Sequence, residues 1–376
     1  MYIRSVRSAV VLAVSLLGLA GVATGQHYTR TDLTVDIAAT SPTAPNFDPN
    51  LVNAWGLARG STSFFWISDN GTGLSTLYNG AGARNPLVVK IPTQDGTGTS
   101  APTGAISNYS SGFEVNGPGT GTPAAFLFCT EDGTIAGWNP TVDRNNAVLK
   151  VKRGGKAIYK GCALAQTGNG IFLFATNFQT GRVDIFDSTF TLVSTRNLQL
   201  DDDDHDNHGK GHNGSGFVPF NIQNVGGNLV VTFAKKQAGS DDEQHGPGLG
   251  AIEIFDPTLH LLSRLQRGAF LNAPWGVALA PGDFGPFSHR LLVGNFGDGT
   301  INAFNIVTGN FEGKMLAPGG STPLVVDGLW ALSFGGNAPN NGLATELFFT
   351  AGPNDEENGL FGKITATSTE QRGNTE

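Results

Sequence analysis

The sequence has little charge and no surplus of basic residues. Charged residues make up 14% of its 376 positions, and 31 Asp and Glu outnumber 23 Lys and Arg, giving a formal net charge of −8. Proteins that bind nucleic acid need clustered Lys and Arg to contact the phosphates, so we expect no nucleic-acid partner. The apolar content of 39% is too high, and the charge too low, for a disordered chain.

Long segments without Gly or Pro are also scarce. The 53 Gly and 19 Pro exclude a helical bundle or a coiled coil, because both residue types destabilise the interior of a helix. The composition therefore predicts a turn-rich, all-β fold with a sizeable hydrophobic core.

Motifs of several common enzyme classes are missing. The sequence has no Gly-Lys-Ser or Gly-Lys-Thr phosphate loop, no Gly-x-Ser-x-Gly turn and no His-Glu-x-x-His helix. The Gly-rich run at residues 117–121 is not followed by a helical pattern. These absences disfavour a nucleotide hydrolase, a serine hydrolase, a zinc protease and a dinucleotide-binding oxidoreductase.

Only two cysteines are present, Cys129 and Cys162. We interpret them as small, buried, non-catalytic side chains in strands. A disulfide is the alternative, and it requires that the fold bring the two Cα atoms to a suitable distance.

The first residues have the pattern of an export signal. Arg4 and Arg7 precede an apolar run at residues 9–23, and small residues stand before Gln26, where a signal peptidase would cut. A retained membrane anchor would need a longer run, of ~18 to 20 apolar residues. We therefore expect a cleaved signal peptide at residues 1–25, no later membrane span, and a secreted or periplasmic monomer with a disordered tail at residues 367–376.

The remaining sequence repeats six times. Each unit opens with a turn and a Gly, or an Asn in one unit, which leads into an apolar strand: Gly56, Gly104, Gly161, Asn221, Gly276 and Gly328. A second apolar strand follows. A second Gly then starts an alternating strand that ends in Asn or Asp six residues later, at Gly73, Gly133, Gly181, Gly250 and Gly299. The sixth unit, from Gly359, is degenerate.

The sixth unit also lacks the fourth strand that the other units have. Residues 32–37 alternate polar and apolar side chains and can supply it. Four-stranded sheets that repeat every ~40 to 50 residues predict a six-bladed β-propeller, with the last blade closed by the N-terminal strand. We expect one domain at residues 26–366, with blades starting near residues 53, 101, 158, 218, 273 and 326. An open solenoid is the alternative, and the displaced strand favours closure.

The repeat pattern resembles the NHL and YVTN kinds of propeller repeat. The segments Asn53–Ala58, Ser68–Gly73, Ala273–Pro281 and Gly352–Glu356 resemble a family of exported bacterial proteins of unknown function. Some members of that family end in a PEP-CTERM sorting tail, which this sequence lacks. The resemblance implies the fold and the location, and it implies no activity.

In a propeller, the turns into the innermost strands and the loops between the second and third strands lie on one face, around the mouth of the central channel. We interpret the aromatic residues there as wedges between blades or as a platform for a sugar or peptide, and the acids and amides as turn caps or as a ligand-binding rim. The candidate binding residues are Trp55, Asp69, Asn70, Glu131, Asn177, Phe220, Lys235, Trp275, Asn295, Asp327 and Asp355.

Calcium is the cofactor that these residues could hold. Ca²⁺ takes ~6 to 8 oxygen ligands. Gluconolactonase-type propellers place acids and amides in the channel, and Asp327 occupies a comparable entry position. The match ends there, because the other entry positions hold Trp, Phe, Lys and Thr; Glu131, after a second strand, is the second candidate. The insertion at residues 201–216 is acidic and is expected to be a flexible loop, whose His205, His208 and His212 are weak candidates for a transition-metal site.

The favoured function is that of an exported binding or interaction module, whose channel-mouth face recognises an unknown glycan, peptide or protein. The alternative is a calcium-dependent lactonase, another hydrolase or a lyase, with Asp327 and Glu131 as metal ligands or base. The fold alone does not decide between these functions, because propellers serve both.

Overall fold

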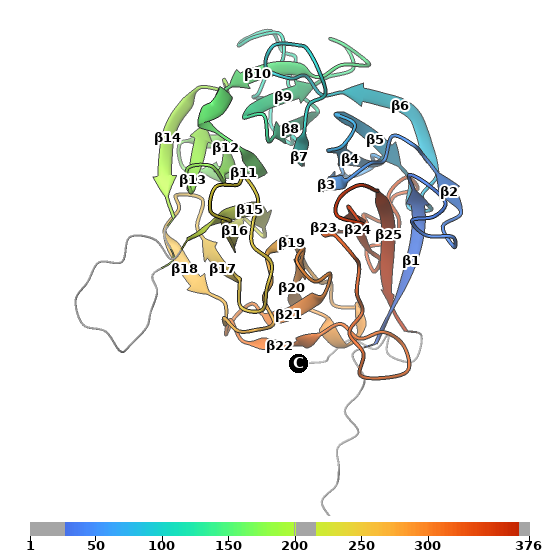
Figure 1. The fold of residues 1–376 in the computed structure, drawn as a ribbon. Coiled ribbons are helices and arrows are strands. Elements are labelled where there is room, and N and C mark those ends of the chain that lie inside the picture. Colours follow the sequence, from blue (N-terminus) through green and yellow to red (C-terminus); the bar gives the residue numbers. More distant parts are fainter. Residues whose placement is uncertain (1–26, 199, 201–215, 368–376) are drawn as a thin grey trace, which may run out of the picture.

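The computed structural model describes residues 27–198, 200 and 216–367. Their strands form six sheets that stand radially around a central axis, as Figure 1 shows. The predicted all-β, six-bladed propeller is therefore confirmed. The expected signal peptide, nearly all of the insertion at 201–216 and all of the tail except Thr367 lie outside the described residues. Within the described ranges, no helix is long and apolar enough to cross a bilayer.

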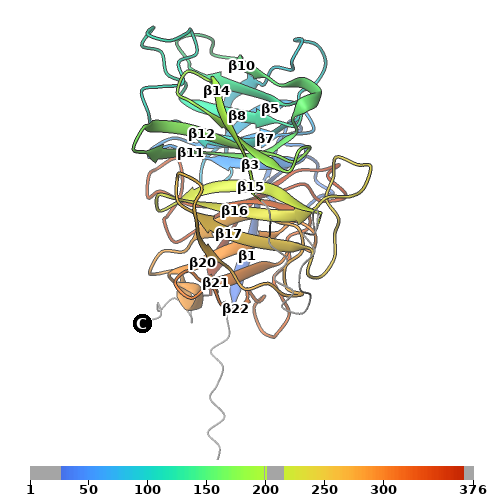
Figure 2. The same ribbon diagram turned by 90° about the vertical axis from the view of Figure 1, so that its left-hand side faces the viewer.

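Each blade has four main strands; the inner strands run roughly along the axis, as β15 and β16 do in Figure 2, whereas outermost strands such as β6 and β14 turn across it (Figure 1). The innermost strands are β3 (Ala54–Ala58), β7 (Pro102–Ser107), β11 (Tyr159–Thr167), β15 (Phe217–Val225), β19 (Pro274–Leu279) and β23 (Leu329–Phe334). The second strands are β4 (Phe65–Asp69), β8 (Phe126–Thr130), β12 (Gly170–Asn177), β16 (Asn228–Lys235), β20 (Arg290–Asn295) and β24 (Leu347–Ala351).

The third strands are β5 (Leu74–Tyr78), β9 (Thr134–Trp138), β13 (Arg182–Phe186), β17 (Gly250–Phe255), β21 (Ile301–Asn305) and β25 (Leu360–Ala366). The outermost strands are β6 (Arg84–Lys90), β10 (Val148–Lys152), β14 (Leu192–Asn197), β18 (Leu261–Arg264), β22 (Phe311–Lys314) and, in the last blade, β1 (Tyr28–Val35). Three short elements complete the described fold: β2 (Asn46–Phe47) and the 3-10 turns η1 (Gly154–Lys156) and η2 (Gly285–Phe287).

The N-terminal strand closes the ring, as the sequence predicted. β1 pairs antiparallel with β25, from Tyr28 opposite Ala366 to Val35 opposite Leu360, and β2 adds a short parallel pair at its outer edge. The Tyr28 side chain is fully buried, and its hydroxyl donates to the carbonyl oxygen of Phe284 (3.1 Å) and accepts from the Phe287 N–H (2.9 Å). The first and last strands of the described chain thus share one sheet.

The first Gly of the repeat lets neighbouring innermost strands approach closely near the axis. A Cβ atom on Gly56 would lie 2.1 Å from the carbonyl oxygen of Thr103, and one on Gly276 would lie 2.3 Å from that of Trp330. No other side chain fits there without moving the backbone. In the sixth blade this position belongs to Ala331, and Gly328 lies three residues earlier in a left-handed turn (φ 62°).

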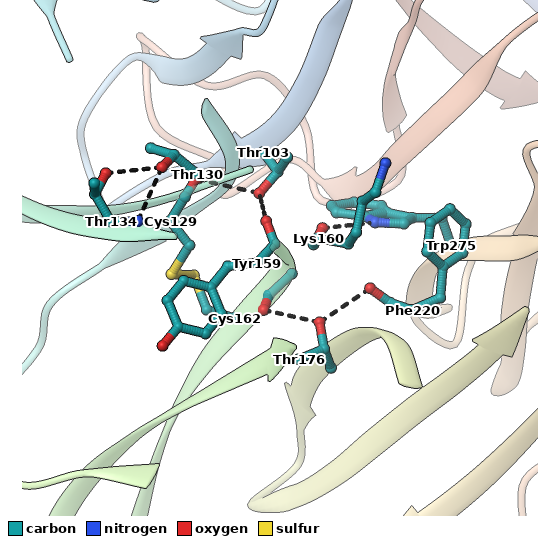
Figure 3. The surroundings of a disulfide bond; sticks show 11 residues. Thr103, Cys129, Thr130, Thr134, Tyr159, Lys160, Cys162, Thr176, Phe220 and Trp275 are labelled. Atoms are coloured by element: carbon teal, nitrogen blue, oxygen red, sulfur yellow. Dashed lines mark hydrogen bonds between the residues drawn. A yellow bond between two sulfur atoms is a disulfide. The ribbon is translucent and has the colours of Figure 1, made fainter. Parts of the chain in front are cut away.

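The two cysteines form a disulfide between neighbouring blades, with their Cα atoms 6.5 Å apart. Both cysteines are buried in strands, as interpreted, and the disulfide that the sequence left open as the alternative is present. Cys129 lies on β8 and Cys162 on β11, inside the hydrophobic cluster that joins the second and third blades (Figure 3). Their proximity depends on the register between blades, which the spacing of two residues along the chain does not contain.

Candidate functional site

A register shift near the start of every innermost strand places one residue at the mouth of the channel. These six mouth residues are Trp55, Thr103, Lys160, Phe220, Trp275 and Trp330. The sequence pattern had assigned Asp327 to the sixth position. The structure places Trp330 there instead and leaves Asp327 exposed in the preceding loop. The pattern misled because the sixth unit has Ala331 where most of the other units have Gly.

Aromatic mouth residues fill the channel at this end. The rings of Trp55 and Trp330 stack with their centroids 3.6 Å apart, and Phe296 stacks on Trp330 at 3.8 Å. Trp275 meets Trp330 edge-on at 5.9 Å, and Phe220 does so at 6.0 Å. We call these five side chains the aromatic plug. The candidates Trp55, Phe220 and Trp275 are thus buried, and their faces are not open to solvent.

Lys160 lies against the plug and is the most buried charged side chain at the mouth. Only 2% of its side chain is exposed, and its Nζ is 5.1 Å from the centroid of the Trp55 ring. The same Nζ is 2.6 Å from Glu131 Oε1 and 3.7 Å from Asp242 Oδ1. In Figure 3 the backbone carbonyl of Lys160 accepts the hydrogen bond from Trp275 Nε1 (3.0 Å), which fixes the lysine to the plug.

A chain of hydrogen bonds between side chains links Glu131 to Glu356. Asn70 Nδ2 donates to Glu131 Oε2 (2.9 Å), and Asn53 Nδ2 donates to Asn70 Oδ1 (3.3 Å) and to Glu356 Oε2 (2.6 Å). Asn53 Oδ1 accepts from Trp330 Nε1 (2.9 Å). We define the mouth cluster as the following residues: Asn53, Asn70, Glu131, Lys160, Glu243, His245 and Glu356.

The charged groups of the mouth cluster shift one another's pKa values. Burial alone would lower the pKa of Lys160, but Glu131, Glu243 and Asp242 raise it above its ordinary value. Burial raises the pKa of Glu356 to about 7, with Glu243 and Glu131 adding to the rise while Lys160 and Asn53 oppose it.

His245 is the cluster's second group with a raised pKa. Its Nε2 lies 3.4 Å from Glu243 Oε1, and this contact raises the pKa of His245 against the opposing effect of burial. The carboxylates of Glu356 and Asp355 add to the rise. The charge of the mouth therefore changes between mildly acidic and neutral pH.

The other predicted site residues separate into buried and exposed groups. Asn177 and Asn295 are buried, and their amides bond to the backbone at Lys156 and Phe270. Asp327 is exposed and accepts from the Asn354 N–H (3.0 Å). Asp355 is exposed on the same loop as Glu356, and Lys235 is half-buried at the end of β16. His205, His208 and His212 lie outside the described residues.

Asp69 is completely buried at the end of β4. Neither of its carboxyl oxygens has a hydrogen-bond partner among the described residues. Burial raises the pKa of Asp69 well above its ordinary value; Asp48 adds to the rise and the nearby Thr76 opposes it. Asp69 is thus buried within the first blade, and its carboxyl group is not accessible to a ligand at the mouth.

We expect Asp69→Asn to stabilise the protein progressively as the pH rises. The carboxyl with a raised pKa stays protonated in the folded state and ionises in the unfolded state, so wild-type stability falls as the pH rises above about 4, by at most about 1.4 kcal/mol per pH unit. Urea unfolding from pH 4 to 8 measures this slope. The exposed Asp355→Asn is the control, and parallel curves for wild type and Asp69→Asn would contradict the expectation.

The calcium and transition-metal expectations find no donor set in the described part of the chain. No group of three or more His, Cys, Asp or Glu is placed there to hold a metal ion. The two calcium candidates have other partners, Glu131 with Lys160 and Asp327 with the Asn354 N–H. Most of the mouth cluster consists instead of residues that were not among the sequence candidates: Asn53, Lys160, Glu243, His245 and Glu356.

Fold and site together define a closed six-bladed propeller with an aromatic plug under a charged mouth. No family model matches the chain. It is 30% identical over 329 residues to Uncharacterized protein L690 of Acanthamoeba polyphaga mimivirus, covering 85% of this chain and 82% of the relative. Uncharacterized protein R648 of the same virus is 32% identical over 327 residues, covering 85% and 76%. The chain belongs to the same family as these mimivirus proteins.

Solved structures agree on the fold. A glucose dehydrogenase is similar with a TM-score of 0.50 and 13% sequence identity, covering 90% of this chain and 100% of that one. At this identity the likeness concerns the propeller architecture alone.

Proposed function

We propose that this protein is an exported ligand-binding propeller that recognises a cationic side chain of a peptide at the mouth cluster. The observation that carries the proposal is the imbalance of charge over the plug. Lys160 is one buried cation, and Glu131, Asp242, Glu243 and Glu356 surround it. A ligand that brings a second cation would complete the neutralisation of these carboxylates.

The loops around the cluster extend the acidic surface. Asp241 and Asp242 have 70% and 71% of their side chains exposed on the loop between β16 and β17, where Glu243 also lies. Asp355 and Glu357 are exposed on either side of Glu356. Exposed like charges around a partly buried acid attract a cationic ligand and raise its rate of association.

One further feature supports an oxidising location. The Cys129–Cys162 disulfide is typical of secreted and periplasmic proteins, in agreement with the export signal and with the resemblance to exported bacterial propellers.

Calorimetric titration with a peptide of alternating Lys and Gly tests the proposal. We expect saturable binding that weakens at least about tenfold, or about 1.4 kcal/mol, when the lysines are acetylated. Because Glu356 ionises with a pKa of about 7, affinity should rise up to about tenfold from pH 6 to 8, and loss of the His245 charge acts in the same direction.

The matched variants are Glu356→Gln and Glu357→Gln, which remove the same charge from neighbouring positions of one loop. Only Glu356→Gln should weaken binding and flatten its pH dependence. Equal effects of both variants would mean that binding depends on the total charge of the loop and not on Glu356 itself. Binding to a glycan array with no peptide binding would reject the peptide and favour a sugar ligand.

A further inference from the structure

The opposite end of the channel has a different chemical character. The innermost strands end there, around a cavity of about 460 Å³ lined by residues from five of the six blades. We call it the lower pocket. The described residues that line it include no Asp or Glu, in contrast to the acidic mouth.

Arg59 lines the lower pocket and bonds to backbone carbonyl groups there. Its Nε donates to the carbonyl oxygen of Phe334 (2.7 Å) and its Nη2 to that of Gly335 (2.9 Å). Among the described residues it forms no ion pair with Asp or Glu. A guanidinium has five N–H groups, so three remain for other acceptors. Burial lowers the pKa of Arg59, as expected for a charge that is partly removed from water without an anion beside it.

Gln223, on the innermost strand β15, also lines the lower pocket. Its Oε1 accepts from the Val277 N–H (2.9 Å) and from Asn221 Nδ2 (3.3 Å), which fixes the orientation of the amide. The Nε2 group then remains as a donor, and no acceptor for it lies among the described residues. In Figure 1, β15 stands across the axis from β3, the strand that Arg59 follows.

The lining between these two donors combines hydroxyl and apolar groups. Ser61 and Ser107 add hydroxyls, Leu57 and Leu164 add apolar surface, and Tyr109 adds an aromatic side chain that is 62% exposed. Donors separated by apolar surface suit a small organic molecule with acceptor oxygens at both ends.

We propose that the lower pocket is a second binding site, which takes a small organic dicarboxylate. One carboxylate accepts from the free N–H groups of Arg59, and the other accepts from the Gln223 amide on the opposite blade. The site is separate from the mouth cluster, because the aromatic plug lies between them. The proposal for the lower pocket therefore does not depend on peptide binding at the mouth.

Titration of the full chain with three four-carbon probes tests this proposal. Succinate has two carboxylates, butanoate has one, and succinamide is neutral. We expect succinate to bind about tenfold more tightly than butanoate, and succinamide to show no saturable binding. Failure of succinate to saturate, or equal binding of succinate and succinamide, overturns the proposal.

Two variants identify the contacts. Gln223→Glu keeps an oxygen acceptor for the Val277 N–H but replaces the donor with a repelling carboxylate, so it should weaken succinate at least about tenfold and butanoate much less. Arg59→Met should weaken both ligands. The exposed Lys90→Met removes one positive charge elsewhere and should weaken neither. Unchanged succinate affinity in a folded Gln223→Glu protein overturns the assignment.

Discussion

Replacing Tyr28 with Ala is expected to lower the free energy of unfolding by about 4 kcal/mol, a typical cost of removing a fully buried aromatic ring. Tyr28 packs against the rings of Phe284 and Phe287, with centroids 5.0 and 5.9 Å away, and its hydroxyl bonds to the backbone of both residues. These contacts hold β1 against the neighbouring fifth blade. Without them the closing strand frays and β25 becomes an open sheet edge.

Urea unfolding followed by tryptophan fluorescence measures this loss. Tyr28→Phe keeps the ring and removes only the hydroxyl, so we expect it to cost about 1 to 3 kcal/mol for the two unsatisfied backbone groups. Thr29→Ala, at an exposed position of the same strand, should cost much less. If Tyr28→Ala and Thr29→Ala unfold alike, ring closure does not depend on this anchor.

Lys160→Met is expected to destabilise the protein by about 3 kcal/mol at neutral pH. Removing one partner of a buried ion pair leaves the other charge uncompensated and costs ~3 to 5 kcal/mol. The lower end of that range applies, because 26% of the Glu131 side chain is exposed and water can solvate it. Glu243, with 4% of its side chain exposed, loses the same counter-charge.

The pH dependence and a second lysine distinguish this effect from a loss of packing. Lys160 holds down the pKa of Glu356, so its removal should raise that pKa further above about 7 and the destabilisation should diminish as the carboxylates become protonated in acid. Lys236→Met is the control, since its Nζ is 4.0 Å from the 70%-exposed Asp241 and such pairs contribute at most about 1 kcal/mol. A cost for Lys160→Met that is constant between pH 4 and 8 would mean that it reflects packing alone.

The sequence predicted the architecture because each blade repeats one local pattern. Gly73, Gly133, Gly181 and Gly299 all adopt left-handed φ values, from 68° to 70°, in the turn between the second and third strands. This turn makes glycine recur at a fixed distance from the end of the third strand. The alternation of residues 32–37 similarly marked the strand that closes the ring, although β1 begins earlier, at Tyr28, and ends earlier, at Val35.

The site was less predictable because its members come from loops of different blades. Asn53 and Glu356 are 303 positions apart in the sequence, and their hydrogen bond exists only because the ring brings the first and last blades together. Glu131 and Asn70 were among the candidates because they follow second strands. Lys160 occupies an ordinary repeat position, and nothing local indicates that four carboxylates converge on it.

The closure of the ring also sets the order of events in biosynthesis. β1 is the first described strand to leave the ribosome, and its partner β25 ends at Ala366, so the last blade can form only after the chain has been made as far as Ala366. Until then the growing propeller is an open arc with two unpaired edges, which are prone to aggregate or to bind chaperones. For a chain that is exported as we propose, this order is an advantage, because translocation can precede closure and the ring is completed in the compartment where Cys129 and Cys162 are oxidised.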